Sequence, residues 1–237
     1  VRSAGVQHKG AFPAPDTGGI GGAPTIFGAT RVPDAETPQI YLLTPPDFEL
    51  SSFPDALGAV LDSADVACVR LALAGGDEDR LSRAGDAVRE VCHARDVAVV
   101  IDSHVALAER LGLDGVHLLD GARSVRDVRK ALGGDAIVGT FCGVSRHDGM
   151  TAGESGADYV AFGPAGASAL GTGTQADRAL FAWWSEMIEV PVVAEGALGP
   201  DVIRDLTPVT DFFAIGDEIW RTEDPVAALR ALTDAMA

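Results

Sequence analysis

The amino-acid sequence predicts an α/β protein of the eight-stranded (β/α)₈, or TIM-barrel, class. Strand-like and helix-like segments alternate regularly from Gln39 to the end of the chain, joined by short linkers. Strand segments such as residues 97–101 are almost wholly apolar, as parallel strands covered by helices require. One sequence pattern also recurs four times, which indicates a fold made of repeated units. A doubly wound sheet is the alternative architecture.

The recurring pattern is an aspartate followed by a short apolar strand. Its clearest copy is the sequence GADYVAFGP at residues 156–164, and the four aspartates are Asp65, Asp114, Asp158 and Asp211. They are about 50 residues apart, which leaves room for a helix, a strand and a second helix between copies. One copy therefore corresponds to a quarter of the fold.

Eight strands and eight helices follow from the apolar patterns. The strands are expected at residues 39–43, 66–70, 97–102, 114–118, 136–140, 158–162, 190–194 and 211–215. The helices are expected at residues 51–62, 77–95, 104–112, 124–132, 148–156, 176–188, 199–206 and 224–236. Leu81, Ala84, Val88 and Val91 have the spacing of one buried helical stripe. Such a count over about 200 residues is typical of a barrel.

The chain divides into an arm and one large domain. Residues 1–37 are rich in Gly, Pro and Ala and show no apolar period, whereas residues 38–237 carry the barrel pattern. We expect the arm to lie against the barrel or against a neighbouring subunit, where it would offer a means of forming a homodimer.

Composition narrows the classes of function. The chain has 237 residues, 47% of them hydrophobic, and contains neither a long membrane-type apolar run nor a signal-peptide pattern, which indicates a cytoplasmic protein. Its three cysteines lack CxxC spacing, which favours reduced thiols and argues against zinc. A net charge of −17 disfavours nucleic acid and membrane surfaces as partners, but leaves a small anionic ligand open.

Barrel enzymes carry their chemistry on the loops at the carboxyl ends of the strands. Two of the residues at these ends, Arg70 and Asp102, are our candidates for catalysis. The other residues expected to line a ligand pocket there are Thr44, Ser103, His117, Phe141, Gly163 and Glu195.

The ends of the seventh and eighth strands predict a phosphate site. Gly196 and Ala197 follow one strand, and Ile215 and Gly216 end the next, so small residues expose backbone N–H groups side by side. Barrels commonly hold a phosphate at this position through such amides. The alternative is that the glycines only permit tight turns.

Several stretches now identify a family resemblance. The sequences IYLLT, VVIDSHVALAERLGLDGVHL, GADYVAFGP, VPVVAEGAL and FFAIGDEIW occur in order over about 200 residues. In these stretches the chain resembles the thiamine-phosphate synthases and the related thiazole tautomerases. The resemblance implies a barrel that joins a pyrimidine diphosphate to a thiazole phosphate with the help of Mg²⁺.

The chain departs from the family at its chemical residues. Of the family's Gln-x-Arg-x-Lys only Arg70 is kept, and the family's Asn-Asp pair is Asp102-Ser103 here. The second magnesium aspartate aligns with Ala122, although Asp120 stands two residues earlier. The family's Ser-x-His becomes residues 141–143, and its Thr-x-Thr-Lys becomes residues 168–171.

These departures predict altered or absent transfer of the diphosphate group. A departing diphosphate needs cations aimed at its developing charge, yet the only lysines are Lys9 and Lys130. We therefore expect no certain cofactor: Mg²⁺ remains an option through Asp102 and Asp120, but no metal cage is evident. Without a suitable lysine, Schiff-base chemistry is excluded.

The charged candidates each have a structural alternative. Arg70 is expected to clamp a ligand, the alternative being an internal ion pair with Asp102 or Glu195. Glu195 would repel a phosphate dianion unless it turns away or is paired, and general-base action is its less favoured role.

The histidines and Cys142 have weaker claims to a chemical role. His117 is expected to be a packed core residue rather than a catalyst, and His104 and His147 are expected to be exposed. Cys142 could act as a nucleophile only beside a base, and none is evident in the sequence.

The sequence thus predicts a thiamine-phosphate-synthase-like barrel that binds a phosphate-bearing small molecule of the thiazole or pyrimidine phosphate type. Two alternatives stay open. One is an active Mg²⁺-dependent thiamine-phosphate synthase, a transferase of thiamine biosynthesis. The other is a regulator that binds the phosphate compound without converting it.

Overall fold

The computed structural model describes residues 37–75, 77–167 and 174–237. Within them, eight parallel strands form one closed barrel in which every strand pairs with its neighbours in chain order. The seam is closed by β8 pairing with β1, with Gln39 opposite Phe212. The predicted (β/α)₈ barrel is therefore confirmed. Apart from Thr37, the expected arm at residues 1–37 lies outside the described residues.

The strands fall within one or two residues of their expected positions. They are β1 (Gln39–Leu43), β2 (Val66–Leu71), β3 (Ala98–Asp102), β4 (Gly115–Leu118), β5 (Ile137–Phe141), β6 (Tyr159–Phe162), β7 (Val192–Glu195) and β8 (Phe212–Ile215). The expected start of β7 at residue 190 was early because Pro191 has no N–H to donate to a ladder.

The helices form the outer ring. They are α1 (Phe53–Leu61), α2 (Glu78–His93), α3 (Val105–Leu111), α4 (Val125–Leu132), α5 (Arg146–Glu154), α6 (Arg178–Met187), α7 (Pro200–Leu206), α8 (Asp217–Trp220) and α9 (Pro225–Thr233), with two 3₁₀ turns at Thr207–Val209 and Asp234–Met236. Helix α5 begins two residues before its expected start, because Ser145 caps it by accepting the N–H of Asp148. The short helix α8 was not among the eight expected helices.

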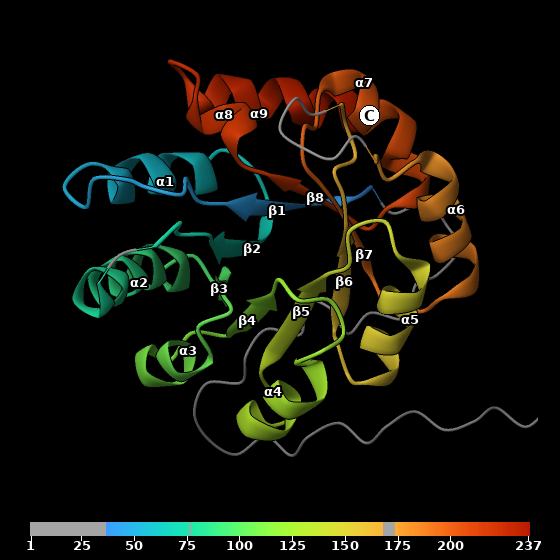
Figure 1. Ribbon diagram of the computed structural model, residues 1–237. Helices are drawn as coiled ribbons and strands as arrows, with labels where there is room; N and C mark the ends of the chain where they lie inside the picture. Colours follow the sequence, from blue (N-terminus) through green and yellow to red (C-terminus); the bar gives the residue numbers. More distant parts are fainter. Residues whose placement is uncertain (1–36, 76, 168–173) are drawn as a thin grey trace, which may run out of the picture.

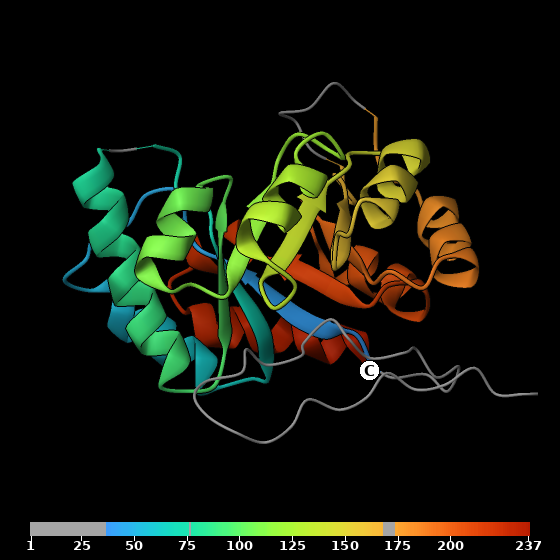
Figure 2. The ribbon, with the colours of Figure 1, turned by 90° about the horizontal axis from the view of Figure 1, so that it is seen from below.

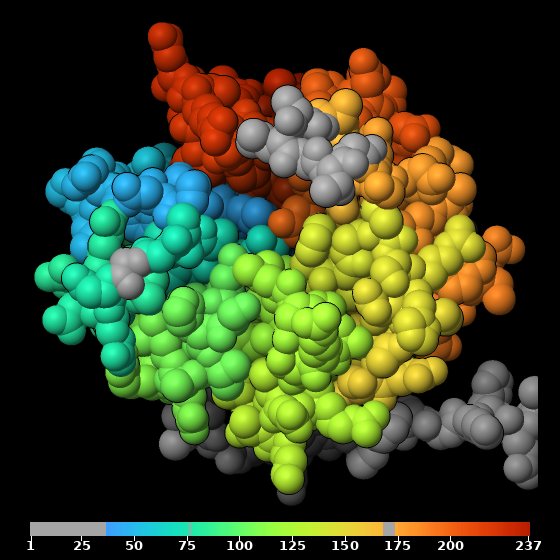
Figure 3. Space-filling model, in the orientation of Figure 1, coloured from blue at the N-terminus to red at the C-terminus, as the bar shows by residue number. Residues whose placement is uncertain are grey.

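The helices follow one another around the barrel in chain order, so the last red elements return beside the first blue ones (Figure 1, Figure 3). After a quarter turn, the strands run through the middle, with α2 and α3 on one side and α5 and α6 on the other (Figure 2). No helix in the described ranges is long and apolar enough to cross a bilayer.

Alternation along the strands separates two apolar layers. Outward residues such as Val69, Val99 and Val160 pack against the helices in the larger cluster. Inward residues fill the barrel itself, and the members of this inner cluster include Tyr41, Cys68, Val100, Ile137, Tyr159, Ala161, Val193, Phe212 and Ala214. Because Cβ directions alternate along a strand, Arg70 shares the inward face with Cys68.

The repeated aspartates fasten neighbouring strands together. Asp114, just before β4, accepts the N–H of Val99 in β3 at 2.7 Å. Asp158 accepts the N–H of Val138, and Asp211 that of Val192, at 2.7 and 2.8 Å. Each carboxylate thus satisfies a backbone donor of the preceding strand and fixes the register of the pair. The fourth copy, Asp65, is exposed.

Candidate functional site

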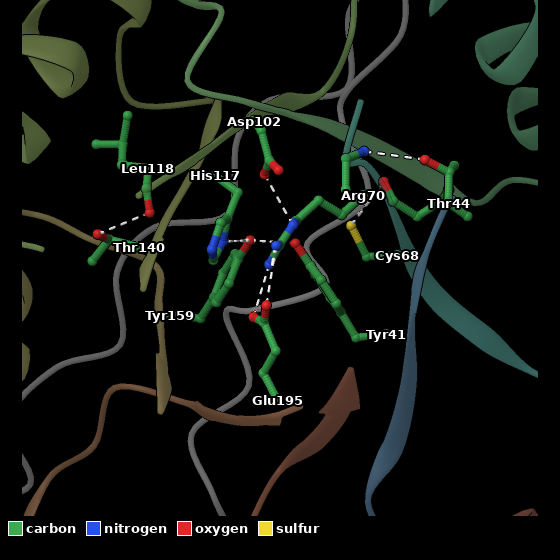
Figure 4. A network of polar contacts seen from close by, with 12 residues as sticks. Tyr41, Thr44, Cys68, Arg70, Asp102, His117, Leu118, Thr140, Tyr159 and Glu195 are labelled. Carbon is green, nitrogen blue, oxygen red and sulfur yellow. Dashed lines mark hydrogen bonds and ion pairs between the residues drawn. The ribbon is translucent and has the colours of Figure 1, made fainter. Parts of the chain in front are cut away.

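Arg70 lies between two carboxylates at the mouth of the barrel. Its Nη1 and Nη2 donate to Oε2 and Oε1 of Glu195 at 2.8 and 3.1 Å. Its Nε lies 2.9 Å from Oδ1 of Asp102, an ion-pair distance without the alignment of a hydrogen bond. Figure 4 shows Asp102 and Glu195 on opposite sides of the guanidinium group. The structure thus shows the internal ion pair that was the alternative for Arg70, and both carboxylates take part in it. Clamping of a ligand by Arg70 stays a prediction.

The three charged groups influence one another because they are buried. The side chains of Arg70, Asp102 and Glu195 are only 6%, 15% and 18% exposed. Burial raises the pKa of Asp102 to about 6; Arg70 opposes that rise and Glu195 adds to it. Burial also opposes the charge of Arg70, but attraction by Glu195 and Asp102 leaves its pKa raised. Arg70 thus remains a cation, while Asp102 exchanges its proton near pH 6.

A neutral polar layer adjoins this charged group inside the barrel. The hydroxyls of Tyr41 and Tyr159 lie 2.6 Å apart, and Nδ1 of His117 lies 2.9 Å from the Tyr159 hydroxyl. Burial raises the pKa of both tyrosines and lowers the pKa of His117 well below its ordinary value, with Arg70 adding to the latter effect. All three side chains are therefore uncharged near neutral pH.

His117 accordingly belongs to the packed interior. It is fully buried and its ring stacks on that of Tyr159, 5.7 Å between centroids. Its Nε2 has no hydrogen-bond partner within the part of the chain that the structure describes. The backbone of Gly139 makes room for this arrangement, because a Cβ there would meet the Tyr159 ring at 1.9 Å.

The rim after β7 has the backbone shape expected of a tight turn. Gly196 and Ala197 have φ angles of 89° and 55°. The loop after β6 packs directly on this turn, because the N–H groups of Ala165 and Gly166 donate to the carbonyls of Glu195 and Gly196 at 2.9 Å. Gly163 permits this close approach, since a Cβ there would lie 2.3 Å from the Glu195 carbonyl.

A carboxylate bridges the rims of β7 and β8. Oε1 of Glu218, in α8, accepts the N–H of Leu198 at 3.0 Å, and its Oε2 accepts the N–H of Gly216 at 2.9 Å. Ile215 ends β8 and Gly216 follows it, at the position predicted to hold a phosphate. The sequence interpretation did not name Glu218, although an acid two residues after Gly216 was a visible signal. Phosphate binding by Gly196, Ala197, Ile215 and Gly216 stays a prediction.

Two polar pocket candidates lie at strand ends but differ in exposure. Thr44 is buried, and its Oγ1 accepts the N–H of Ala72 at 3.1 Å, so it ties the segments after β1 and β2. Ser103 is exposed with a φ of 53°, and its N–H donates to the carbonyl of His117 at 2.9 Å. Thr44 therefore has a structural partner, whereas the Ser103 side chain faces solvent.

A depression of about 600 Å³ opens beside the ends of β4 and β5. The residues that line it include Leu119, Asp120, Arg123, Phe141, Cys142 and Asp148. Phe141 thus faces a hollow, as expected of a pocket residue. Burial, with Asp148 adding to it, raises the pKa of Cys142 to about 12, so this thiol is not a ready nucleophile. His104 and His147 are exposed, as expected.

The described residues do not form a ready site for Mg²⁺. No group of three or more His, Cys, Asp or Glu side chains among them could hold a metal ion. Asp102 is paired with Arg70, and Asp120 accepts the hydroxyl of Ser124 at 2.6 Å. The segment aligned with the family's Thr-x-Thr-Lys, residues 168–171, lies outside the described residues.

Besides Glu218, the sequence interpretation missed Tyr41 and Tyr159. Both lie within strands that were correctly placed, and period-two alternation puts both on the inward face. Their hydroxyls could have been recognised as buried polar groups that need partners. Which partner each finds depends on how strands far apart in sequence face one another across the barrel.

Comparison with known proteins agrees with this architecture. Residues 40–212 match the family model described as thiamine monophosphate synthase. A thiamine-phosphate synthase of Rhodospirillum centenum is 41% identical over 198 residues, which cover 81% of this chain and 94% of the relative. One from Erythrobacter litoralis is 37% identical over 205 residues, covering 84% and 95%.

Solved structures show the same fold. Thiamine phosphate pyrophosphorylase from Pyrococcus furiosus superposes with a TM-score of 0.72 at 20% identity, over 84% of this chain and 95% of that chain. A 3-hexulose-6-phosphate synthase superposes with a TM-score of 0.62 at 17% identity, over 84% and 100%. From the family match and the two close relatives we conclude that this chain belongs to the thiamine monophosphate synthase family.

Proposed function

We propose that this protein binds a phosphate-bearing heterocycle of the thiazole or pyrimidine phosphate type, and that its diphosphate-transfer chemistry is altered or lost. The observation that carries the proposal is the pairing of Arg70 with both Glu195 and Asp102. Phosphate binding is supported by the rims of β7 and β8, whose amides already hold one anionic group, the carboxylate of Glu218.

The charge at the mouth explains the altered chemistry. Two carboxylates surround one guanidinium group, so the cluster carries a net negative charge whenever Asp102 is ionised. A departing diphosphate needs positive groups directed at it, and each such interaction lowers the activation free energy by about 3 kcal/mol or more. Because Glu195 and Asp102 already face Arg70, their negative charge offsets the attraction that Arg70 could offer to a diphosphate.

Magnesium has no assigned role in the proposal. In the described residues, the two aspartates that lie near the positions of the family's magnesium ligands have other partners: Asp102 faces Arg70 and Asp120 binds Ser124. To coordinate Mg²⁺, the side chains of both aspartates would have to leave these partners, and further oxygen ligands would be needed. We therefore derive no step through a metal ion.

A second candidate is an active thiamine-phosphate synthase. It is favoured by the relatives of that name from Rhodospirillum centenum and Erythrobacter litoralis, which match over 94% and 95% of their lengths. On this reading, the substrate's diphosphate and Mg²⁺ would reorganise Arg70 and Asp102. A non-catalytic regulator would bind the same ligands without converting them.

An assay with both substrates separates these functions. The purified protein is mixed with the pyrimidine diphosphate, the thiazole phosphate and Mg²⁺, and thiamine phosphate is measured by its fluorescent oxidation product. The Rhodospirillum centenum relative is assayed in parallel. We expect a rate at least about 100-fold lower than that of the relative, because one such electrostatic interaction alone contributes that much. An equal rate would support the synthase and reject the altered chemistry.

Direct binding measurements complete the test. Calorimetric titration of the thiazole phosphate, without the second substrate, is expected to show saturable binding to the unmodified protein. Binding without any turnover would favour the regulator. If neither the thiazole phosphate nor the pyrimidine diphosphate, titrated in the same way, binds at millimolar concentration, the proposed ligand class is rejected.

A further inference from the structure

At the predicted phosphate rim, the side chain of Glu218 is bound to the loops after both β7 and β8. It bridges Leu198, which follows β7, and Gly216, which follows β8, with distances of 3.0 and 2.9 Å. The two amides come from segments that are separate in sequence, so the carboxylate holds the two loops together. Leu198 and Gly216 are buried, and their N–H groups need an acceptor.

We propose that Glu218 acts as an internal anion that occupies the amide donors of this rim and must leave before a phosphate can bind there. The proposal rests on the proposed function, and extends it by assigning a residue that sets the affinity for the phosphate group. Neither Gly196 nor Ala197 is required to move: the competition is between two acceptors for the amides of Leu198 and Gly216.

The geometry of a carboxylate fits this role. Its two oxygens accept one N–H each, which is how a phosphate uses two of its oxygens against a pair of backbone amides. A phosphate carries more negative charge than a carboxylate, so it interacts more strongly with the same donors. The exchange therefore replaces one satisfied anion by another and leaves no buried N–H unpaired.

Glu218 is also able to leave. It is half-buried, whereas the two residues whose amides it holds are buried, so its carboxylate can return to water by rotating its side chain. Its helix α8 has only four residues. Only molecules in which Glu218 has left the amides can bind phosphate there. The apparent affinity for phosphate is therefore reduced in proportion to the fraction of such molecules.

Phosphate affinity in matched variants tests the proposal. Glu218→Ala removes the competitor. Glu218→Gln keeps its shape, but turns an N–H₂ group toward one of the two donors. Asp217→Asn is the control: it removes the same charge from the neighbouring residue, whose carboxylate forms an exposed pair with Arg221. Inorganic phosphate is titrated into each protein by calorimetry at constant ionic strength.

We expect both Glu218 variants to bind inorganic phosphate at least about tenfold more tightly than the unmodified protein, because each competing charge-assisted hydrogen bond contributes more than 1 kcal/mol. The Asp217→Asn protein should stay within about twofold of the unmodified protein, since its charge acts only through solvent. The amide resonances of Leu198 and Gly216 should respond to phosphate in the Glu218 variants.

Two results would overturn the role of Glu218. Equal phosphate affinity in the Glu218 variants and the unmodified protein would show that the carboxylate is not a competitor. Phosphate binding that leaves the Leu198 and Gly216 resonances unchanged would place the anion elsewhere. If the thiazole phosphate still binds the unmodified protein, only this inference fails. If it binds no variant, the proposed function fails with it. Near-ultraviolet circular dichroism of the Gln variant verifies its fold.

Discussion

The Arg70 guanidinium and the Glu195 carboxylate face each other across the barrel mouth as a two-point pair, with N–O distances of 2.8 and 3.1 Å. Such a parallel pair fixes the plane of the guanidinium group. Arg70 comes from β2 and Glu195 from β7, so the pair connects strands that are not neighbours in the barrel. It thereby braces the mouth from within.

Breaking this pair should destabilise the protein. Glu195→Gln removes the charge but keeps the shape, and we expect the free energy of unfolding to fall by about 2 kcal/mol. This is less than the ~3–5 kcal/mol for a buried charge that loses every partner, because Asp102 still faces Arg70. Urea unfolding at pH 7.5 measures the loss. Glu186→Gln, on the exposed surface of α6, is the control and should not change stability. An equal, unmeasurable effect of both changes would contradict a structural role for the pair.

The proton on Asp102 should make stability depend on pH. The carboxyl has a pKa of about 6 in the folded protein against an ordinary value of 3.8. A folded state that holds its proton more tightly is favoured at low pH, so this contribution is complete below about pH 4 and is lost as pH rises through 6. Asp102→Asn removes the titration. We therefore expect the variant to gain stability relative to the unmodified protein between pH 4 and pH 7.

The size of that gain is bounded by the pKa shift, at up to about 3 kcal/mol. Urea unfolding of both proteins from pH 4 to pH 8 gives the difference, and carboxyl carbon resonances give the midpoint for Asp102 directly. Asp135→Asn, at an exposed position, should give a curve parallel to that of the unmodified protein. A carboxyl midpoint near 4 would refute the prediction.

The aspartates of the repeated pattern should contribute unequally to the free energy of unfolding. Asp114→Ala leaves the N–H of Val99 without its acceptor and also breaks the 2.9 Å contact with His93. We expect a loss of about 1–3 kcal/mol in the free energy of unfolding, which is the cost of one buried unsatisfied donor. Asp65→Ala, at the exposed position of the same repeat, is the matched control and should be close to neutral. Equal losses of stability in the two variants would show that the hydrogen bond to Val99 does not account for the contribution of Asp114.

Space for the Tyr159 ring is a further testable feature. A Cβ at residue 139 would lie 1.9 Å from that ring, so Gly139→Ala must displace it and disturb its contacts with Tyr41 and His117. Overpacking of this kind costs about 1–3 kcal/mol. Gly134→Ala, where a Cβ would meet nothing within 4 Å, should leave stability unchanged or slightly higher. Thermal unfolding of the two variants provides the comparison, and similar melting temperatures would contradict it.

The barrel could be predicted from sequence because its signals are local. Short apolar runs placed every strand within two residues, and the aspartate pattern reflects a hydrogen bond between strands only one helix apart, as at Asp158 and Val138. Boundaries shifted where a cap or a proline decided them, as at Ser145 and Pro191. These effects depend on single residues rather than on a periodic pattern.

The site was less accessible because its contacts cross the barrel. The sequence placed Arg70, Asp102 and Glu195 at strand ends, but only the closed fold shows that both carboxylates reach the same guanidinium group. Glu218 was overlooked because its role depends on the amides of Leu198 and Gly216 pointing at one spot. Whether a ligand displaces these internal partners depends on relative affinities, which a residue pattern does not encode.

The aspartate fastenings also bear on the order in which the barrel forms. Their three hydrogen bonds span only 15, 20 and 19 residues of sequence, so the strand couplets β3–β4, β5–β6 and β7–β8 close short loops. The β1–β8 seam, by contrast, unites the two ends of the barrel sequence. Closing a short loop costs less conformational entropy than closing a long one. We therefore expect these three strand pairs to become protected from hydrogen exchange early during refolding, and the β1–β8 pair to form last.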